Sequence, residues 1–252
     1  MGIVILQTLF NKLFSLASLW LLLSMIMPSQ AQALSPVTIS YTIKFESNKF
    51  GNATLGRIEN ILKTTEQGYS MESVTKAQGM AAIIMGSNEQ QSCEFEVLDG
   101  KAVSQKYDGG RIGEIEYQVD FDWQQRKAYF NQKSGSSESI DLPEGYIVDN
   151  CSMWFAVALL KNDIPEHQSL YVVDGKNKRI RGFKLRSTSN ETLSTKLGEK
   201  QVTKVVFERE LRPGRTLTFW LSHDDEYLPL KMQESRKSRT TTFEVAELSL
   251  DS

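Results

Sequence analysis

The sequence is poor in the residues that build metal and cofactor sites. Its 252 residues include two histidines, His167 and His223, and two cysteines, Cys93 and Cys151. Neither pair has the spacing of metal ligands, and two cysteines alone cannot form a structural zinc site. No glycine-rich phosphate loop and no G-x-S-x-G nucleophile motif occurs. The sequence therefore predicts no metal and no cofactor, and it contains no motif that defines an enzyme class.

The sequence also lacks a large net charge of either sign. Lys and Arg number 29 and Asp and Glu number 31, which gives a formal net charge of −2 at pH 7. Proteins that bind nucleic acid usually carry a clear basic excess, because they must neutralise phosphates. We therefore expect no nucleic-acid partner.

Long apolar runs are confined to the N-terminal segment. The run Leu13–Met27 follows the single charge of Lys12, and Ala31-Gln32-Ala33 fits the small-x-small pattern for cleavage before Leu34. The run is shorter than a typical membrane-spanning helix. We predict a signal peptide over residues 1–33, and a single periplasmic domain over 34–252 with no stable membrane span after cleavage. The alternative is an uncleaved anchor in the inner membrane, because the residues before Lys12 are also mostly apolar.

The two cysteines both lie in the predicted exported part. An isolated pair in an oxidising compartment favours a disulfide between Cys93 and Cys151. Closing this loop would stabilise the fold by about 4 kcal/mol in the chain-entropy model. Two buried thiols are the alternative interpretation.

Most of the remaining sequence has the period-two pattern of half-buried strands. In "VTISYTIKFES" (37–47) and "EIEYQVDFDW" (114–123), apolar and polar residues alternate. Asp99-Gly100 is a strong hairpin signal. The pattern predicts ten or more short antiparallel strands, with no βαβ alternation.

Only one segment is typical of a helix. "DNCSMWFAVALLKND" begins at a capping Asp149 or Asn150, ends before Pro165 and is apolar on nearly every side. A helix of this kind is buried. A second apolar piece, "GMAAIIMG" (79–86), predicts a short helix or an inward loop. The predicted fold is mainly β: a single curled antiparallel sheet forming an open or closed barrel, with one buried helix (about 149–162) as plug or lid.

Four stretches resemble bacterial exported proteins of the domain of unknown function 3108 family. They are "YTIKFESNKFGNATLGRIE", "DNCSMWFAVALL", "LSTKLGEKQVTKVVFERE" and "FWLSHDDEYLPLKMQ". The second carries the family's Asp-x-x-Ser at Asp149 and Ser152. The last carries its signature at Trp220, Leu221, Asp224, Tyr227, Leu228 and Pro229. The family has no assigned activity, so the resemblance implies no catalytic residue.

The resemblance also implies an architecture. The family is similar to the half-barrel of periplasmic lipoprotein carriers, in which a curved sheet surrounds an apolar cavity under a helical lid. Fold alone does not establish function. If the sheet does not collapse on itself, a lipid-sized cavity would be lined by Phe45, Phe95, Tyr117, Phe121, Trp123, Trp154, Phe155 and Phe219, together with Met80 and Met85. Composition alone favours a filled core instead.

Two basic runs form a further candidate site. "KNKRIRGFKLR" contains Lys176, Lys178, Arg179, Arg181, Lys184 and Arg186, and "ESRKSR" contains Arg236, Lys237 and Arg239. Together they could form a patch for an anionic lipid or polysaccharide. The pattern more often reflects a solvated hairpin whose charges protect a sheet edge.

Ser222, His223 and Asp224 bring together the residue types of a hydrolytic triad. Adjacent residues do not form a triad by adjacency, and these types favour turns. We therefore expect a hairpin within "FWLSHDDEYLPLKM" (219–232).

Three functional hypotheses follow. The first is a non-catalytic half-barrel that binds a lipid or another hydrophobic or amphiphilic ligand. The second is an interaction module that binds an envelope protein at an open sheet edge. The third is a hydrolase of envelope material that uses Ser222 and His223.

Overall fold

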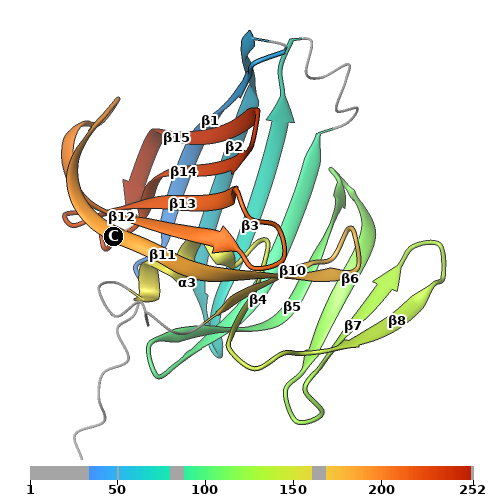
Figure 1. Ribbon diagram of the computed structural model, residues 1–252. Coiled ribbons are helices and arrows are strands. Elements are labelled where there is room, and N and C mark those ends of the chain that lie inside the picture. The colour runs from blue at the N-terminus through green and yellow to red at the C-terminus, as the bar shows by residue number, and fades with distance from the viewer. Residues whose placement is uncertain (1–33, 50, 80–87, 161–168, 251–252) are drawn as a thin grey trace, which may run out of the picture. The chain divides into compact units, whose positions relative to one another are not determined.

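A computed structural model describes residues 34–49, 51–79, 88–160 and 169–250. These residues form one sheet of fifteen strands and one helix (Figure 1). The first eight strands are β1 (Val37–Ser47), β2 (Gly51–Thr65), β3 (Gly68–Ala77), β4 (Glu89–Leu98), β5 (Lys101–Arg111), β6 (Glu114–Asp122), β7 (Lys127–Gln132) and β8 (Ser137–Asp141). After them come β9 (Tyr146–Asp149), α3 (Met153–Leu160), β10 (Leu170–Asp174), β11 (Arg179–Thr195), β12 (Gly198–Arg209), β13 (Arg215–Ser222), β14 (Pro229–Arg236) and β15 (Arg239–Leu250).

The strands follow one another around the sheet, and the chain passes from one edge to the other only once. β1 to β8 form one run of antiparallel neighbours, and β10 to β15 form a second. Pairing of β1 with β15 joins the two runs. The edges of the sheet are therefore β8 and β9, which are neighbours in sequence. All pairings are antiparallel except that of β9 with β10.

The sheet curls until the β9 edge meets β5. The backbone N–H of Ala102 on β5 donates to the Tyr146 hydroxyl on β9 at 3.1 Å. The next turn along, after β10, packs on β6, where Gly175 lies against the Tyr117 ring. On β8, Glu138 is 3.6 Å from the Lys178 ammonium. The described strands are thus closed by side-chain contacts along this seam and not by a continuous hydrogen-bond ladder.

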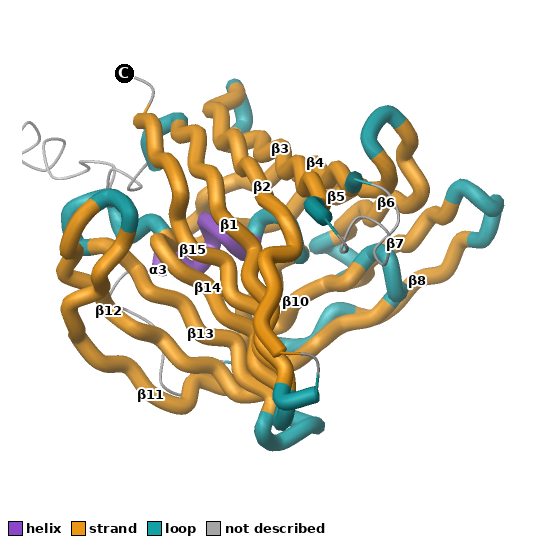
Figure 2. Tube along the Cα trace, turned by 90° about the horizontal axis from the view of Figure 1, so that it is seen from above, coloured by secondary structure: helices purple, strands orange, loops and turns teal. Residues whose placement is uncertain are grey.

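Helix α3 lies within the curve of the sheet (Figure 2). All eight of its residues are buried, as the apolar sequence predicted. The Trp154 ring lies 4.8 Å from the Tyr41 ring and 5.2 Å from the Phe243 ring, centroid to centroid. The predicted mainly-β fold with one buried helix is confirmed, and the helix is a plug. No helix among the described residues is long and apolar enough to cross a membrane.

Some elements of the fold were not anticipated from the sequence. Residues 179–195 form one long strand, β11, which has a register shift at Leu185 to Ser187. The pattern did not indicate the short edge strands β8 and β9. The predicted inward piece 79–86 falls largely outside the described residues, as do the predicted signal peptide 1–33 and His167.

Candidate binding pocket

A pocket of about 350 Å³ lies between the concave face of the sheet and the first turn of α3. Its apolar wall consists of Ile43, Leu55, Ile58, Met153, Trp154, Phe183, Leu217, Met232 and Phe243. Met153 and Trp154 belong to α3, and the other residues come from strands far apart in sequence, because the curl of the sheet brings β2 opposite β11 and β13. The strand residues occupy inward positions of the period-two pattern, which explains why this part of the wall is apolar.

The pocket also has a polar side, on which Arg181 is the most buried charge. Its guanidinium donates a hydrogen bond to the Asn150 side chain, and its Nε is 3.9 Å from the Asp174 carboxylate. The Nε atom is buried and makes no hydrogen bond with any described residue. Burial lowers the pKa of Arg181, and the Asp174 charge partly offsets that effect. Other polar lining residues are Thr75, Glu89, Gln91, Glu234 and Thr241.

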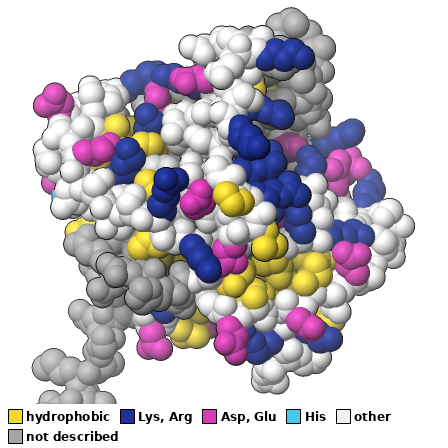
Figure 3. All heavy atoms as spheres, in the orientation of Figure 1, with side chains coloured by type: hydrophobic (Ala, Val, Ile, Leu, Met, Phe, Trp, Pro, Cys, Tyr) yellow, Lys and Arg dark blue, Asp and Glu magenta, His cyan; other side chains and the backbone are white. Residues whose placement is uncertain are grey.

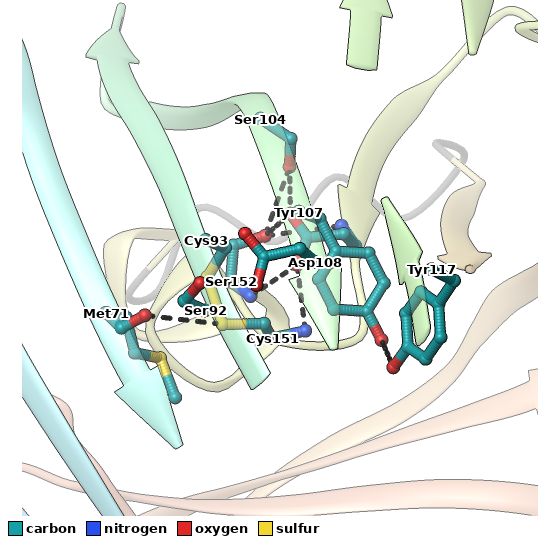
Figure 4. The surroundings of a disulfide bond; sticks show 10 residues. Met71, Ser92, Cys93, Ser104, Tyr107, Asp108, Tyr117, Cys151 and Ser152 are labelled. Atoms are coloured by element: carbon teal, nitrogen blue, oxygen red, sulfur yellow. Dashed lines mark hydrogen bonds between the residues drawn. A yellow bond between two sulfur atoms is a disulfide. The ribbon is translucent and has the colours of Figure 1, made fainter. Parts of the chain in front are cut away.

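The first turn of α3 is fixed by a buried polar network (Figure 4). Asp149 Oδ1 accepts hydrogen bonds from the backbone N–H groups of Cys151 and Ser152 at 2.8 and 2.7 Å. Asp149 Oδ2 accepts from the hydroxyls of Ser104 and Ser152 at 2.6 and 2.7 Å. Burial raises the pKa of Asp149, although these hydrogen bonds act in the opposite direction. The family-like Asp-x-x-Ser therefore positions the helix that forms one wall of the pocket.

A disulfide joins Cys93 on β4 to Cys151 in the same turn (Figure 4). The two Cα atoms are 6.0 Å apart, within the usual span for this bond. Asp149 lies close to both sulfurs. The cluster is not a thiolate metal site, because the sulfurs are bonded to each other and the carboxylate already accepts four hydrogen bonds.

Of the described residues that were predicted to line a cavity, only Trp154 lines this pocket. Phe45 is half-buried and pairs across the ladder with the lining residue Thr241, so it lies on the same face at the rim. Phe155 is fully buried within α3. Met80 and Met85 fall outside the described residues.

The remaining predicted residues fill space elsewhere. Phe95 stacks on Tyr69 and Phe219 packs edge-on against Phe207. The Tyr117 hydroxyl is 2.9 Å from that of Tyr107, and Phe121 stacks on Trp123. Much of the described interior is thus a packed core, and the pocket lies beside the first turn of α3.

Ser222 is the last residue of β13, and His223 and Asp224 lie in the turn that leads to β14, as expected for a hairpin. The Ser222 hydroxyl donates to Asp225 at 2.6 Å, whereas His223 Nε2 is 2.9 Å from the Thr203 hydroxyl. No hydrogen bond joins Ser222 to His223 among the described residues. Ser222 is fully buried and His223 is exposed. The arrangement lacks the nucleophile–base contact that a triad needs.

The signature residues around this turn have structural roles. The Trp220 indole N–H donates to Glu191 at 2.6 Å, and the Lys204 and Lys231 ammonium groups lie 5.3 and 4.9 Å from its ring centroid. Pro229 begins β14, and its carbonyl accepts a hydrogen bond from the Tyr41 hydroxyl at 2.8 Å. The signature therefore secures a hairpin to β1 and β12.

These features define the class of the protein: a curled antiparallel half-barrel whose described part encloses a helix and an amphipathic pocket. The family model described as "Protein of unknown function (DUF3108)" matches residues 40–243, and the chain belongs to this family. No curated protein matched the sequence.

Among solved structures, the chain is similar to a beta-barrel-like protein of domain of unknown function DUF1849 from Brucella abortus. The TM-score is 0.57 at 12% identity, and the alignment covers 87% of this chain and 99% of that chain. This likeness shows a shared fold. MucB aligns with a TM-score of 0.33 at 10% identity, over 89% of this chain and 56% of that one. A putative outer membrane lipoprotein-sorting protein domain from Vibrio parahaemolyticus aligns with a TM-score of 0.28 at 7% identity, over 86% of each chain.

Proposed function

We propose that this protein is an exported, non-catalytic binding protein that holds a hydrophobic or amphiphilic small molecule in the pocket beside α3. The observation that carries the proposal is the pocket itself. It is walled by apolar side chains and has polar groups on one side, which is the usual composition of a small-molecule site. Its volume of 350 Å³ falls at the lower end of the range of roughly 300–1,000 Å³ for such sites.

Export to the periplasm is supported by two observations. The N-terminal pattern is typical of a signal peptide. The disulfide between Cys93 and Cys151 is a bond that persists in oxidising compartments such as the periplasm.

The size of the pocket limits the ligand. Among the described residues, helix α3 and the aromatic core fill much of the curled sheet, and a pocket of about 350 Å³ has room for one short chain or ring system. We therefore propose a single-chain ligand in preference to a lipid with several long chains.

The proposal can be tested by filling the pocket. Leu217 lies on its wall, whereas Leu211 is 92% exposed. Native mass spectrometry with 1-decanol and decyl phosphate should show a stoichiometric complex with the wild-type protein. We expect Leu217→Trp to lose the complex and Leu211→Trp to keep it. Absence of a complex with both probes, or an unaffected Leu217→Trp variant, would disprove the proposal.

A second candidate function rests on the free side of β8. Among the described strands it pairs with β7 alone, and four of its five residues are exposed. Such an edge could bind an extended segment of an envelope protein. Photo-crosslinking from position 139 in cells should then capture one specific partner, and Ser139→Pro should abolish its capture. We do not propose a hydrolase, because the Ser222 hydroxyl donates to Asp225 and His223 Nε2 faces the Thr203 hydroxyl.

A further inference from the structure

Five arginines form a group, here called the arginine rim, at one end of β11 to β14: Arg179, Arg181, Arg209, Arg215 and Arg236. Arg181 itself lines the pocket. The ladder places the others on the same face, because residues directly opposite one another, and residues two apart in one strand, share a face. Arg209 is opposite the lining residue Phe183. Arg215 is opposite Arg236 and two residues from the lining residue Leu217.

The two basic runs of the sequence therefore meet at the mouth of one pocket. On the molecular face in Figure 3, Lys and Arg side chains gather in one area. The other basic residues of β11 differ from the rim in orientation. Lys184 and Arg186 occupy the alternate positions of the strand, whose side chains belong to its other face. They lie 4.0 and 3.8 Å from the carboxylates of Glu210 and Glu208. They fit the solvated-hairpin interpretation, whereas the rim arginines do not.

The rim has more positive charge than its neighbours neutralise. Asp174 accepts two hydrogen bonds from Arg179, at 3.0 and 2.9 Å, and Glu234 lies 2.6 Å from Arg236. A third carboxylate at the pocket, Glu89, is paired with Lys176 at 2.5 Å. Five rim arginines thus face two available carboxylates, an excess of three positive charges.

Three of the rim arginines are incompletely satisfied. Arg209 and Arg215 form no ion pair with a described residue, and Arg181 Nε has no hydrogen-bond acceptor. Desolvation, followed by the charges of other arginines, lowers the pKa of Arg209 and of Arg215. Arginines that repel one another around a pocket mouth, with donors left over, form a site in which an anion would be stabilised.

We propose that the ligand of this pocket is an anionic amphiphile, with a phosphate or carboxylate headgroup held by the arginine rim and a single apolar chain inserted beside Trp154. This inference rests on the proposed function and specifies the chemistry of the ligand. The fork of the guanidinium group matches both oxyanions, and the apolar wall begins directly below Arg181 with Phe183 on the same strand.

Calorimetric titration with three probes separates the headgroup from the chain. Decyl phosphate and 1-decanol share a chain and differ in charge, and inorganic phosphate has the charge without the chain. We expect decyl phosphate to bind at least about tenfold more tightly than decanol and than inorganic phosphate, because charge-assisted hydrogen bonds add to chain burial. Raising the salt concentration should weaken the binding of decyl phosphate and leave the binding of decanol unchanged.

Matched double variants test the rim. The double variant Arg209→Ala, Arg215→Ala removes two charges that have no ion-pair partner among the described residues. No carboxylate therefore loses its partner. This variant should bind decyl phosphate about tenfold more weakly and decanol as before. Lys184→Ala with Arg186→Ala removes the same net charge from the alternate positions of β11 and should change neither affinity.

The outcomes are distinct. Equal binding of decyl phosphate and decanol overturns the inference and leaves the proposed function intact, whereas failure of both to bind overturns both. Inorganic phosphate binding as tightly as decyl phosphate shows a free-anion site and overturns the amphiphile assignment. An equal loss in the two double variants shows a diffuse charge effect and also overturns it.

Discussion

The hydroxyl of Ser104 on β5 donates a hydrogen bond to the carboxylate of Asp149 on β9 at 2.6 Å. β5 lies inside one run of strands and β9 is the far edge of the sheet, so this contact joins two parts of the barrel that have no backbone pairing. It also orients the turn that leads into α3. The seam and the pocket wall thus share one buried carboxylate.

Replacement of Asp149 by Asn should change how stability depends on pH. Burial raises the pKa of Asp149 in the folded protein above its ordinary value of 3.8. The folded state then holds the proton more tightly than the unfolded state. Stability of the wild type should therefore fall, relative to Asp149→Asn, as the pH rises from 3.8 through the raised pKa. Urea unfolding from pH 3.5 to 8 measures this, and parallel curves for the two proteins would contradict it. Asp149→Ala should cost at least about 2 kcal/mol at all pH values, because two buried N–H groups lose their acceptor.

Loss of the disulfide should lower stability without changing the topology. Cys93 and Cys151 are 58 residues apart, and the bond restricts the unfolded chain. The double replacement by Ala should lower the free energy of unfolding by about 4 kcal/mol. Denaturant titration with and without reductant provides the measurement. Reductant should destabilise the wild type and leave the double variant unchanged.

Gly175→Ala should weaken the seam. A Cβ atom at position 175 would lie 2.8 Å from the Tyr117 ring and 2.9 Å from the Val119 side chain. We expect a loss of about 1–3 kcal/mol from this overpacking. Hydrogen exchange should show the greatest loss of protection in β9 and β10. Ser136→Ala, which removes an exposed contact with Lys178 in the same seam, serves as the control and should change stability by less than about 0.5 kcal/mol.

Asn60→Leu should raise stability. The Asn60 side chain is completely buried on β2, and neither its oxygen nor its nitrogen has a hydrogen-bond partner among the described residues. Replacing this amide by an apolar group of similar size should add about 1–2 kcal/mol to the free energy of unfolding. Asn52→Leu on the exposed start of β2 is the matched control. A decrease for Asn60→Leu would indicate that the amide binds a water molecule or a ligand.

Ser222→Ala should destabilise the protein more than His223→Ala does. The buried Ser222 hydroxyl donates to Asp225, and its loss should cost about 1 kcal/mol. His223 is exposed, and its loss should cost less than about 0.5 kcal/mol. Thermal unfolding compares the two. Equal loss of a cellular function in both variants, with stability unchanged, would instead support the triad hypothesis.

Sequence periodicity predicted the parts of this fold that depend on local alternation. It identified β1 and β6 because their apolar residues recur at every second position, and α3 because its residues are apolar all round. The hairpin at Ser222 to Leu228 was predicted because its polar residue types favour turns. The cysteine pair could be inferred because both residues lie in a segment predicted to be exported.

The pocket could not be predicted in the same way. Alternation shows that Phe95 faces inward, and the all-round apolar helix shows that Trp154 is buried, but neither pattern shows which inward residues touch the helix and which border empty space. That depends on the curl of the sheet and on the seam between β9 and β5, neither of which has a local pattern. The sequence pattern does place Arg179 and Arg181 on the same strand face as Phe183, because these residues are two apart. Their meeting with Arg215 and Arg236 depends on pairings between distant strands.

The pairing of β1 with β15 has a consequence for how the molecule is made. Residues 37–47 leave the ribosome early, yet one side of β1 has no neighbour until residues 239–250 arrive. An incomplete chain therefore displays a long strand edge with an apolar face, which is a template for association with other chains. We expect truncations that remove β15 to be insoluble rather than merely less stable. Successful production then depends on keeping the nascent chain apart from its copies until the last strand is available.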